Sequence, residues 1–335
     1  MNNHTRLPRL GLLLGDRYGV GPELVGKLIN NPPELQSQVI VVGDRRVLEL
    51  GLKAAGGGAV PDAVEPDQTE DDMPGIAFQD FSSPDIAAEP RGEVAAAVGS
   101  EVLKQLETLA SLCRQGVLDG FVFAPLNKQS MRLGGLNGQD ELDHLVGSID
   151  FSGAVGEINI LGDLWTTRVT AHVPLRDVAD AITEASVLAA IELAATSLAR
   201  AGQQNPTIAV SGLNPHAGDG GAFGREEIEI IAPAIEQANR MSIKAFGPYS
   251  PDTVFLQAPR DGHRAIVTMY HDQGQIAMKL MGFGKGVTLH AGLPFPVTTP
   301  AHGTAFDIAG QGVATPEGLY AALAVAEQMA MAPRS

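Results

Sequence analysis

The sequence predicts an α/β protein with a mainly parallel β-sheet and two lobes. Short apolar segments alternate along the chain with longer segments of helical periodicity, which is the pattern of β-α-β units. The chain has 335 residues, more than a single hydrophobic core usually supports. Hydrophobic residues make up 44% and charged residues 19%, and this balance excludes an intrinsically disordered chain.

The first expected elements lie on either side of a glycine turn. The apolar segment 9–14 predicts a buried strand, and Pro22 at the end of the turn suits the first turn of a helix that begins near Glu23. The segment 38–44 predicts a second strand. From Gly51 to Gly75 the chain is rich in Gly, Pro and acidic residues without periodicity, so we expect an exposed connection there.

The rest of the chain continues the alternation. Helical spacing of Ala, Val and Leu predicts a long helix over 92–115, and the apolar run 120–125 predicts a strand that leads into the loop at 126–128. Strands are then expected at 207–211 and 264–269, and helices at 176–201, 224–239, 303–310 and 316–331. Binding residues in such folds collect on loops at the carboxyl ends of strands.

The charge balance limits the classes of partner. Asp and Glu number 39 against 23 Lys and Arg, a formal charge of −16, which disfavours nucleic acid and anionic membranes. A small anionic substrate would therefore need a local cluster of cations or a metal ion. No apolar run of about 18 residues and no signal-peptide pattern is present, so we expect a cytoplasmic protein. The single cysteine, Cys113, is expected to be a buried packing residue.

Three histidines occur where a site is expected. His172, His216 and His271 each follow a strand-like segment or lie in a glycine-rich turn. A single histidine is more often structural, but neutral imidazole suits Zn, Co, Ni or Mn. Three ligands with an open position are typical of a catalytic metal that polarises a substrate oxygen.

Two glycine-rich loops have alternative interpretations. The loop from Asn214 to Gly221 is either an ordinary polar loop or a segment whose backbone approaches a ligand near the start of the next helix. The turn from Gly15 to Pro22 is either a phosphate-binding loop or a tight strand-to-helix turn. Neither the dinucleotide-binding pattern nor the P-loop pattern is present, so the motif does not decide between them.

An alcohol oxidation also needs a proton acceptor. Four titratable residues lie beside the loops that carry the histidines: Lys128, Asp252, Asp272 and Lys279. The residues alone do not choose among them.

A series of motifs resembles the 4-hydroxythreonine-4-phosphate dehydrogenase family across nearly the whole chain. The motifs are GDxxG[IV]GPE (15–23), PLNK (125–128), TAHVPL (170–175), GLNPHAGDGGxxGxEE (212–227), GPxxxDTxF (247–255), YHDQG (270–274) and LPFxxTxxxHGTAFDIAG (293–310). Because they occur in the family's order, the chain is identified as a member.

The resemblance implies a fold and a set of ligands. It implies the three-layer α/β/α fold of isocitrate and isopropylmalate dehydrogenases, with an active site in a cleft at the interface of a homodimer. Residues 1–130 with 285–335 would form an NAD-binding lobe, and 131–284 a metal, substrate and dimerisation lobe. The three histidines would hold one divalent ion (Zn, Co, Ni, Mn or Mg) per site, with ligands from both chains. The segment resembling HGSAPDIAG would bind NAD through His302, Gly303, Thr304 and Asp307.

The resemblance also implies a reaction. Hydride passes from a metal-bound secondary alcohol to NAD, giving a ketone, and carbon dioxide is then lost. Metal charge on the oxygen stabilises both the developing alkoxide and the enolate. Lys279 is expected to contact substrate or handle a proton, with Asp252 and Asp272 as further candidates for the base.

Several positions depart from the family's phosphate-binding pattern. The usual His and Thr of Gly-His-Thr-Glu are Gln139 and Asp140, the usual Asn before LPF is Thr288, and the usual Arg after it is Val297. Losing Arg removes a bidentate anion donor, and Asp140 would repel a phosphate dianion. A non-phosphorylated substrate is therefore expected, with the cis-dihydrodiol of an aromatic dicarboxylate such as terephthalate or isophthalate as the leading candidate.

Arg17 and Tyr18 replace the family's usual Pro after Gly-Asp. They would supply a carboxylate partner and a stacking face for such a substrate, unless Arg17 is simply solvent-exposed. Two alternatives remain open: oxidation of 4-hydroxythreonine 4-phosphate in pyridoxal phosphate synthesis, and a non-catalytic protein that binds metal and a small molecule.

Overall fold

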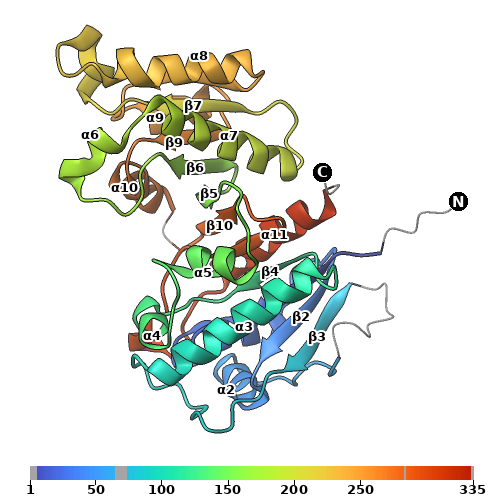
Figure 1. The fold of residues 1–335 in the computed structure, drawn as a ribbon. Coiled ribbons are helices and arrows are strands. Elements are labelled where there is room, and N and C mark those ends of the chain that lie inside the picture. The colour runs from blue at the N-terminus through green and yellow to red at the C-terminus, as the bar shows by residue number, and fades with distance from the viewer. Residues whose placement is uncertain (1–5, 65–73, 283, 333–335) are drawn as a thin grey trace, which may run out of the picture. The chain divides into compact units, whose positions relative to one another are not determined.

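The computed structural model describes residues 6–64, 74–282 and 284–332, and it divides the chain into two compact units (Figure 1). Unit 1 comprises residues 1–152 and 293–335, and unit 2 comprises residues 153–292. The boundaries differ from those of the expected lobes. Residues 131–152, expected in the metal and substrate lobe, lie in unit 1, and residues 285–292, expected in the NAD-binding lobe, lie in unit 2. No helix among the described residues is long and apolar enough to cross a membrane.

Unit 1 contains a parallel sheet with the strand order β3-β2-β1-β4-β11. The strands are β1 (Arg9–Leu13), β2 (Gln38–Gly43), β3 (Gly75–Asp80), β4 (Gly120–Phe123) and β11 (Val297–Pro300). Strands β1, β2 and β4 are buried almost throughout, as expected where helices cover both faces of a parallel sheet. The predicted strands at 9–14, 38–44 and 120–125 are confirmed.

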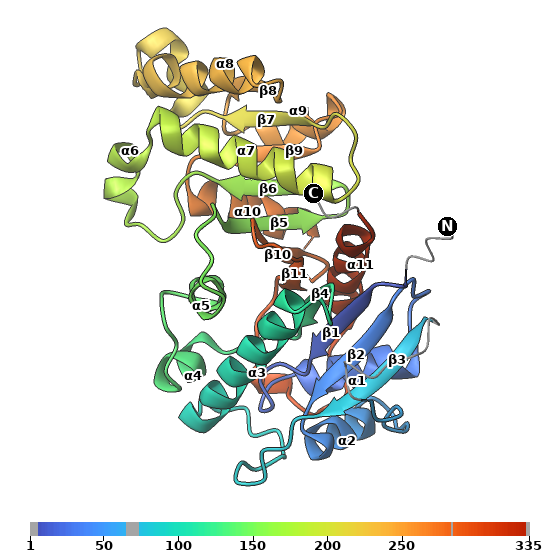
Figure 2. The same ribbon diagram turned by 45° about the vertical axis from the view of Figure 1, so that its right-hand side comes forward.

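Helices pack on both faces of this sheet. Figure 2 shows α3 (Ala96–Arg114) across one face, with α1 (Gly21–Asn30) and α2 (Arg45–Ala54) behind the strands. Also in unit 1 are α4 (Lys128–Leu133), α5 (Glu141–Ser148) and α11 (Glu317–Met331).

The prediction of an exposed connection from Gly51 to Gly75 is wrong for its first residues. Gly51 lies within α2 and is buried, and a Cβ atom there would lie 2.2 Å from the carbonyl oxygen of Pro22. The glycine therefore permits α1 and α2 to pack closely. Residues 65–73 of that connection lie outside the described residues.

Unit 2 contains a mixed sheet with the strand order β10-β5-β6-β9-β7-β8. The strands are β5 (Gly156–Leu161), β6 (Leu164–Arg168), β7 (Thr207–Ser211), β8 (Lys244–Tyr249), β9 (Ala265–Thr268) and β10 (Val287–Ala291). β5 is antiparallel to both its neighbours, whereas β6, β9, β7 and β8 are parallel. The parallel strands end at one edge, where the loops that carry the candidate histidines begin.

Four helices flank these strands: α7 (Glu184–Arg200), α8 (Ala232–Arg240), α9 (Val254–Arg260) and α10 (His271–Gly282). Val254 and Ala258 of α9 and Met278 of α10 share one buried cluster with Ile266 of β9, which places these two helices on the same face. The mixed α/β class is confirmed.

Three expected helices differ from the structure. The segment 176–201 is broken into the short 3-10 turn η1 (Leu175–Asp177), α6 (Val178–Ala181) and α7, because Thr183 and Ser186 form a capping box that starts α7 anew. The segment 224–239 contains the π-helix η3 (Glu227–Ile231) before α8. At 303–310 there is only the 3-10 turn η4 (Phe306–Ile308).

Candidate active site

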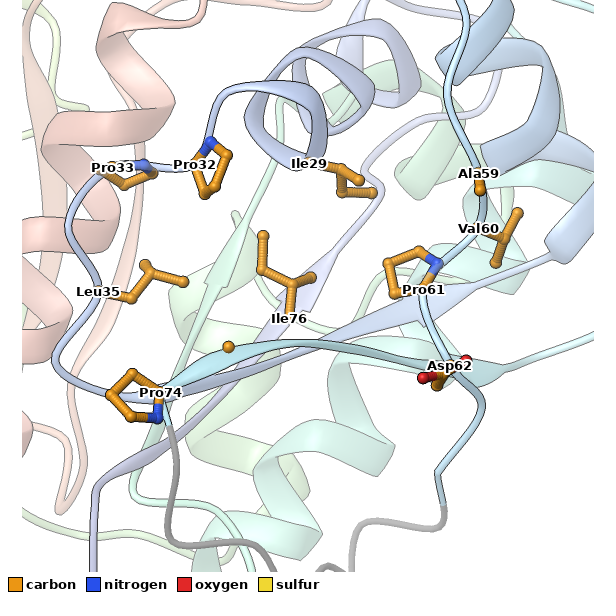
Figure 3. Close-up of a pocket in the computed structure, with 11 residues that line it drawn as sticks. Ile29, Pro32, Pro33, Leu35, Ala59, Val60, Pro61, Asp62, Pro74 and Ile76 are labelled. Atoms are coloured by element: carbon orange, nitrogen blue, oxygen red, sulfur yellow. The ribbon is translucent and has the colours of Figure 1, made fainter.

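A hollow of about 570 Å³ at the edge of unit 1 is not the candidate site (Figure 3). Its wall is formed almost wholly by aliphatic side chains and prolines such as Ile29, Pro61 and Ile76. Asp62 is the one ionisable residue in the lining. Acid–base or metal chemistry needs several converging polar groups, and this hollow does not provide them.

His172 and His271 come together at the carboxyl edge of the sheet in unit 2. β6 and β9 are neighbouring parallel strands. Beyond the end of β6 the two chain segments stay side by side, because Thr170 N donates to Met269 O at 3.1 Å. The two imidazole rings lie with their centroids 5.9 Å apart. His172 is exposed and His271 is partly exposed, so both rings are accessible to a ligand.

The residues after His271 orient its ring. His271 Nδ1 lies 2.6 Å from Asp272 Oδ1, which leaves Nε2 as the nitrogen available to an ion. A carboxylate on the second imidazole nitrogen is the usual arrangement for a metal-binding histidine. Asp272 thus lies where it can set the orientation of His271.

His216 belongs to the turn η2 (Pro215–Gly221), which has an unusual backbone. His216, Ala217 and Asp219 all adopt left-handed conformations with φ between 45° and 54°. This conformation costs a non-glycine residue about 1–2 kcal/mol, and such strain is typical of functional loops. This backbone is typical of functional loops, and the functional interpretation of this segment stays a prediction.

Asp252 lies near His216. A hydrogen bond from Ser250 Oγ (2.6 Å) and, to a lesser degree, the proximity of His216 lower the pKa of Asp252. Its carboxylate is exposed and ionised at neutral pH. Asp252 is thus placed to interact with His216 electrostatically.

The described part of the chain does not assemble a complete metal site by itself. No three His, Cys, Asp or Glu side chains within it are grouped closely enough to hold an ion. His172 and His271 are brought together, whereas His216 is not brought into a three-residue group with them. Two imidazoles facing one another suit a divalent ion chemically, and a third ligand is needed to complete the usual set.

Two other candidate substrate residues lie in unit 2, and their surroundings differ. Lys279 is exposed on α10, and Thr288 on β10 accepts a hydrogen bond from Asn159 Nδ2 at 3.1 Å. Asn159 Oδ1 in turn accepts from Gln275 Nε2, on the same helix as Lys279. Thr288 thus belongs to a polar network, and Lys279 is a solvent-facing cation.

In unit 1, Asp140 has a local structural role. Asp140 is the N-cap of α5, and its Oδ1 accepts from the amides of Leu142 and Asp143, both at 3.1 Å. The neighbouring Gln139 is exposed. Val297 lies in β11 and is fully buried.

Arg17 differs from both expectations. Its side chain is 3% exposed, and its guanidinium forms a bidentate pair with the buried Glu101, including Nε to Oε2 at 2.8 Å. It also donates to the carbonyl oxygens of Ile86 and Ala87, both at 3.2 Å. The carboxylate partner of Arg17 is therefore a residue of the protein itself, and the side chain is not solvent-exposed.

The glycine turn between β1 and α1 is a tight turn in which four backbone amides donate hydrogen bonds within the protein. The amides of Asp16, Gly19 and Val20 donate to the carbonyl oxygens of Pro125, Asp16 and Thr304, respectively. Tyr18 N donates to Asp16 Oδ1. These four amides are bound within the protein and are therefore not available to a phosphate group.

Asp16 is a titratable group within this turn. Burial, with a smaller contribution from the negative Glu101, raises the pKa of Asp16 to about 6. Because the protonated form is favoured in the folded state, its contribution to stability is present at low pH and is lost as pH rises through about 6. Asp16→Asn should therefore raise the free energy of unfolding more at pH 8 than at pH 5, measured by urea denaturation. Equal changes at both pH values would contradict the assignment.

The segment expected to bind NAD lies beside this turn. Thr304 is buried and its carbonyl accepts from Val20, while His302 is partly exposed and Gly303 and Asp307 are exposed. Ala305 adopts a left-handed conformation with φ 43°. Glu23 holds the following loop, because its carboxylate accepts from Gly312 N at 2.9 Å and Ala314 N at 2.8 Å.

Sequence reasoning did not assign roles to Glu23, Glu227 or Gln273, although each lies in a quoted motif. Gln273 accepts from Met269 N at 2.6 Å and donates to Gly212 O at 2.9 Å, so it joins the ends of β9 and β7. The signal available in the sequence was their position within motifs that also contain the candidate ligands.

Comparison with known proteins identifies related sequences and structures. The family model described as pyridoxal phosphate biosynthetic protein PdxA matches residues 35–326. A Rhizobium meliloti protein named provisionally as a 4-hydroxythreonine-4-phosphate dehydrogenase is 42% identical, over 98% of this chain and 95% of its own. A D-threonate 4-phosphate dehydrogenase of Bordetella bronchiseptica is 37% identical, over 97% and 93%. The crystal structure of the Klebsiella pneumoniae 4-hydroxythreonine-4-phosphate dehydrogenase is 32% identical with a TM-score of 0.84, covering 98% of this chain and 99% of that one.

The dihydrodiol enzymes are more distant. The structure of a terephthalate 1,2-cis-dihydrodiol dehydrogenase from Burkholderia xenovorans is 26% identical with a TM-score of 0.67, covering 96% of this chain and 98% of that one. The comparisons therefore favour the phosphate-ester alternative over the aromatic dihydrodiol that the altered motif positions suggested.

Proposed function

Because the chain belongs to the PdxA family, we propose that it is an NAD-dependent, metal-dependent dehydrogenase of a small phosphorylated hydroxy acid. The substrate class is that of 4-hydroxythreonine 4-phosphate or D-threonate 4-phosphate, the substrates in the names of its relatives. The observation that carries the proposal is the pair of facing imidazoles of His172 and His271 at the carboxyl edge of a parallel sheet.

A divalent ion would be held by His172 and His271 of one protomer and by the partner's His216. This arrangement agrees with the pairing of two histidines within the chain and with the incomplete ligand set described above. It would also account for the exposed position of His216 in the η2 turn, because a ligand to a partner's site must lie at the surface of its own chain.

The distribution of exposed apolar side chains supports a homodimer formed through unit 2. Among the described residues, ten of the fourteen large hydrophobic side chains that are exposed belong to this unit, although it is the smaller one. Leu280 is 84% exposed, and Leu256 on α9, which lies on the same face as α10, is 70% exposed. Val173 and Phe223, near two of the histidines, are also exposed. Such apolar surface is typical of an interface.

The residues around the site have complementary tasks. When bound, the metal ion supplies positive charge that polarises the substrate hydroxyl and lowers its pKa. Asp272 orients His271 through the 2.6 Å contact to Nδ1. Lys279, an exposed cation on the helix that begins at His271, binds the substrate anion. His302, Gly303, Thr304 and Asp307 would hold NAD, which would supply the hydride acceptor.

Two structural observations weaken the case for a non-phosphorylated substrate. Asp140 is engaged as a helix N-cap, so its charge is partly compensated by two amides and by the start of α5. Arg17 is engaged by Glu101 and is not free to bind the carboxylate of an aromatic substrate. A phosphate ester is therefore compatible with the surroundings of Asp140 and Arg17.

The test is NADH formation by enzyme reconstituted with a divalent metal. The substrates offered separately are 4-hydroxythreonine 4-phosphate, D-threonate 4-phosphate and the cis-dihydrodiols of terephthalate and isophthalate, with carbon dioxide release measured in parallel. We expect turnover of a phosphate ester and none of the dihydrodiols. Turnover of a dihydrodiol alone would overturn the substrate class, and absence of NADH with every substrate would favour a binding protein.

A further inference from the structure

The η2 turn that carries His216 is stabilised by one buried side chain from the next helix. Glu227 is 2% exposed at the start of η3. Its Oε1 accepts from Leu213 N at 2.8 Å and from Asn214 N at 2.7 Å, and its Oε2 accepts from Asn214 Nδ2 at 3.0 Å. One carboxylate thus holds both residues at the entrance of the turn.

The same carboxylate also lies against the middle of the turn. A Cβ atom on Gly218 would approach Glu227 Oε2 to 2.7 Å, and one on Gly212 would approach Oε1 to 3.0 Å. The chain therefore wraps around the carboxylate from Gly212 to Gly218, with His216 on the outside. Although burial acts to raise it, the pKa of Glu227 is lowered by hydrogen bonds from Asn214 and Leu213, so the anion is the form that holds the turn.

We propose that Glu227 is a positioning residue that keeps the His216 turn in its left-handed conformation and thereby presents His216 to the metal ion. This inference rests on the proposed function, because it takes His216 to be a metal ligand. Glu227 itself contacts neither metal nor substrate. Glu227 acts on the shape of the loop. Without it, the non-glycine residues in the left-handed region would relax to commoner backbone conformations.

The experiment compares Glu227→Gln with Glu229→Gln, a matched control two residues along. Glu229 is exposed and pairs only with the exposed Arg225 among the ion pairs of this segment. Gln keeps the shape of Glu227 but turns an amide NH2 group toward one of the three donors, so the turn loses an acceptor. Metal-free protein is titrated with Co²⁺ and followed by visible absorption, and exchange of the 212–224 amides is followed by mass spectrometry.

We expect Glu227→Gln to weaken Co²⁺ binding roughly tenfold or more, the range seen when groups that support a ligand are removed. Its Co²⁺ spectrum should change and the 212–224 amides should exchange faster, whereas Glu229→Gln should match wild type. Glu227→Asp keeps the charge but shortens the side chain, so its Co²⁺ affinity and amide exchange should lie between those of Glu227→Gln and wild type. It replaces Glu227→Gln in the experiment if that variant does not fold.

The outcomes separate the inference from the proposed function. Wild-type affinity and spectrum in Glu227→Gln would overturn the positioning role even if its thermal stability fell. If wild-type protein bound no Co²⁺, the proposed metal site would fail, and unchanged amide exchange in Glu227→Gln would then separately overturn the claim that Glu227 holds the turn.

Discussion

His172→Ala and His216→Ala should each abolish activity, yet a heterodimer of the two variants should recover about half of the wild-type turnover per dimer. Each single variant removes a ligand from both sites, and loss of metal assistance should cost about 10³-fold or more in kcat. In the heterodimer, one site combines intact His172 and His271 of one chain with intact His216 of the other. The measurement is NADH formation by heterodimers purified through two different affinity tags.

The matched control is the heterodimer of His172→Ala with His271→Ala. Because these two side chains face one another within one protomer, both sites of this heterodimer are damaged and it should stay inactive. Metal content should agree, with about one bound ion per dimer in the first case and none in the second. Recovery in the control, or none in the first heterodimer, would refute the assignment of ligands to the two subunits.

Arg17→Met should destabilise the protein by about 3–5 kcal/mol, because it leaves the buried Glu101 without its partner. Asp16 and Asp44 lie beside the same guanidinium, so more than one carboxylate loses its compensation. The measurement is the free energy of unfolding in urea at pH 7. The KM for substrate should stay within about twofold of wild type, since the guanidinium binds protein groups.

Two further variants make this prediction specific. Arg225→Met removes an exposed arginine that pairs with Glu229, and should change stability by less than about 1 kcal/mol. Adding Glu101→Leu to Arg17→Met should restore part of the lost stability, because a buried ion pair can be replaced by apolar side chains. A large rise in KM with unchanged stability would instead restore Arg17 as a substrate residue.

The sequence by itself determined the fold class and the family, and it singled out three histidines as candidate metal ligands. Continuous apolar runs such as 9–13 and 38–43 form the central strands of unit 1, since a strand covered on both faces needs no alternation. Six strands were not predicted, because short segments with polar positions carry weak periodicity. They are β3, β5, β6, β8, β10 and β11. The helices α4 and α5 are also short, and their caps at Asn127 and Asp140 were the available signals.

Only the tertiary structure decided which partners the charged residues have. Arg17 meets Glu101 across 84 positions of the chain, a pairing that depends on packing β1 against α3. His172 meets His271 because β6 and β9 are neighbouring parallel strands, although the two histidines lie 99 positions apart in the sequence. The left-handed turn at His216 likewise depends on Glu227, whose buried carboxylate acts only once the helix has folded beside the loop.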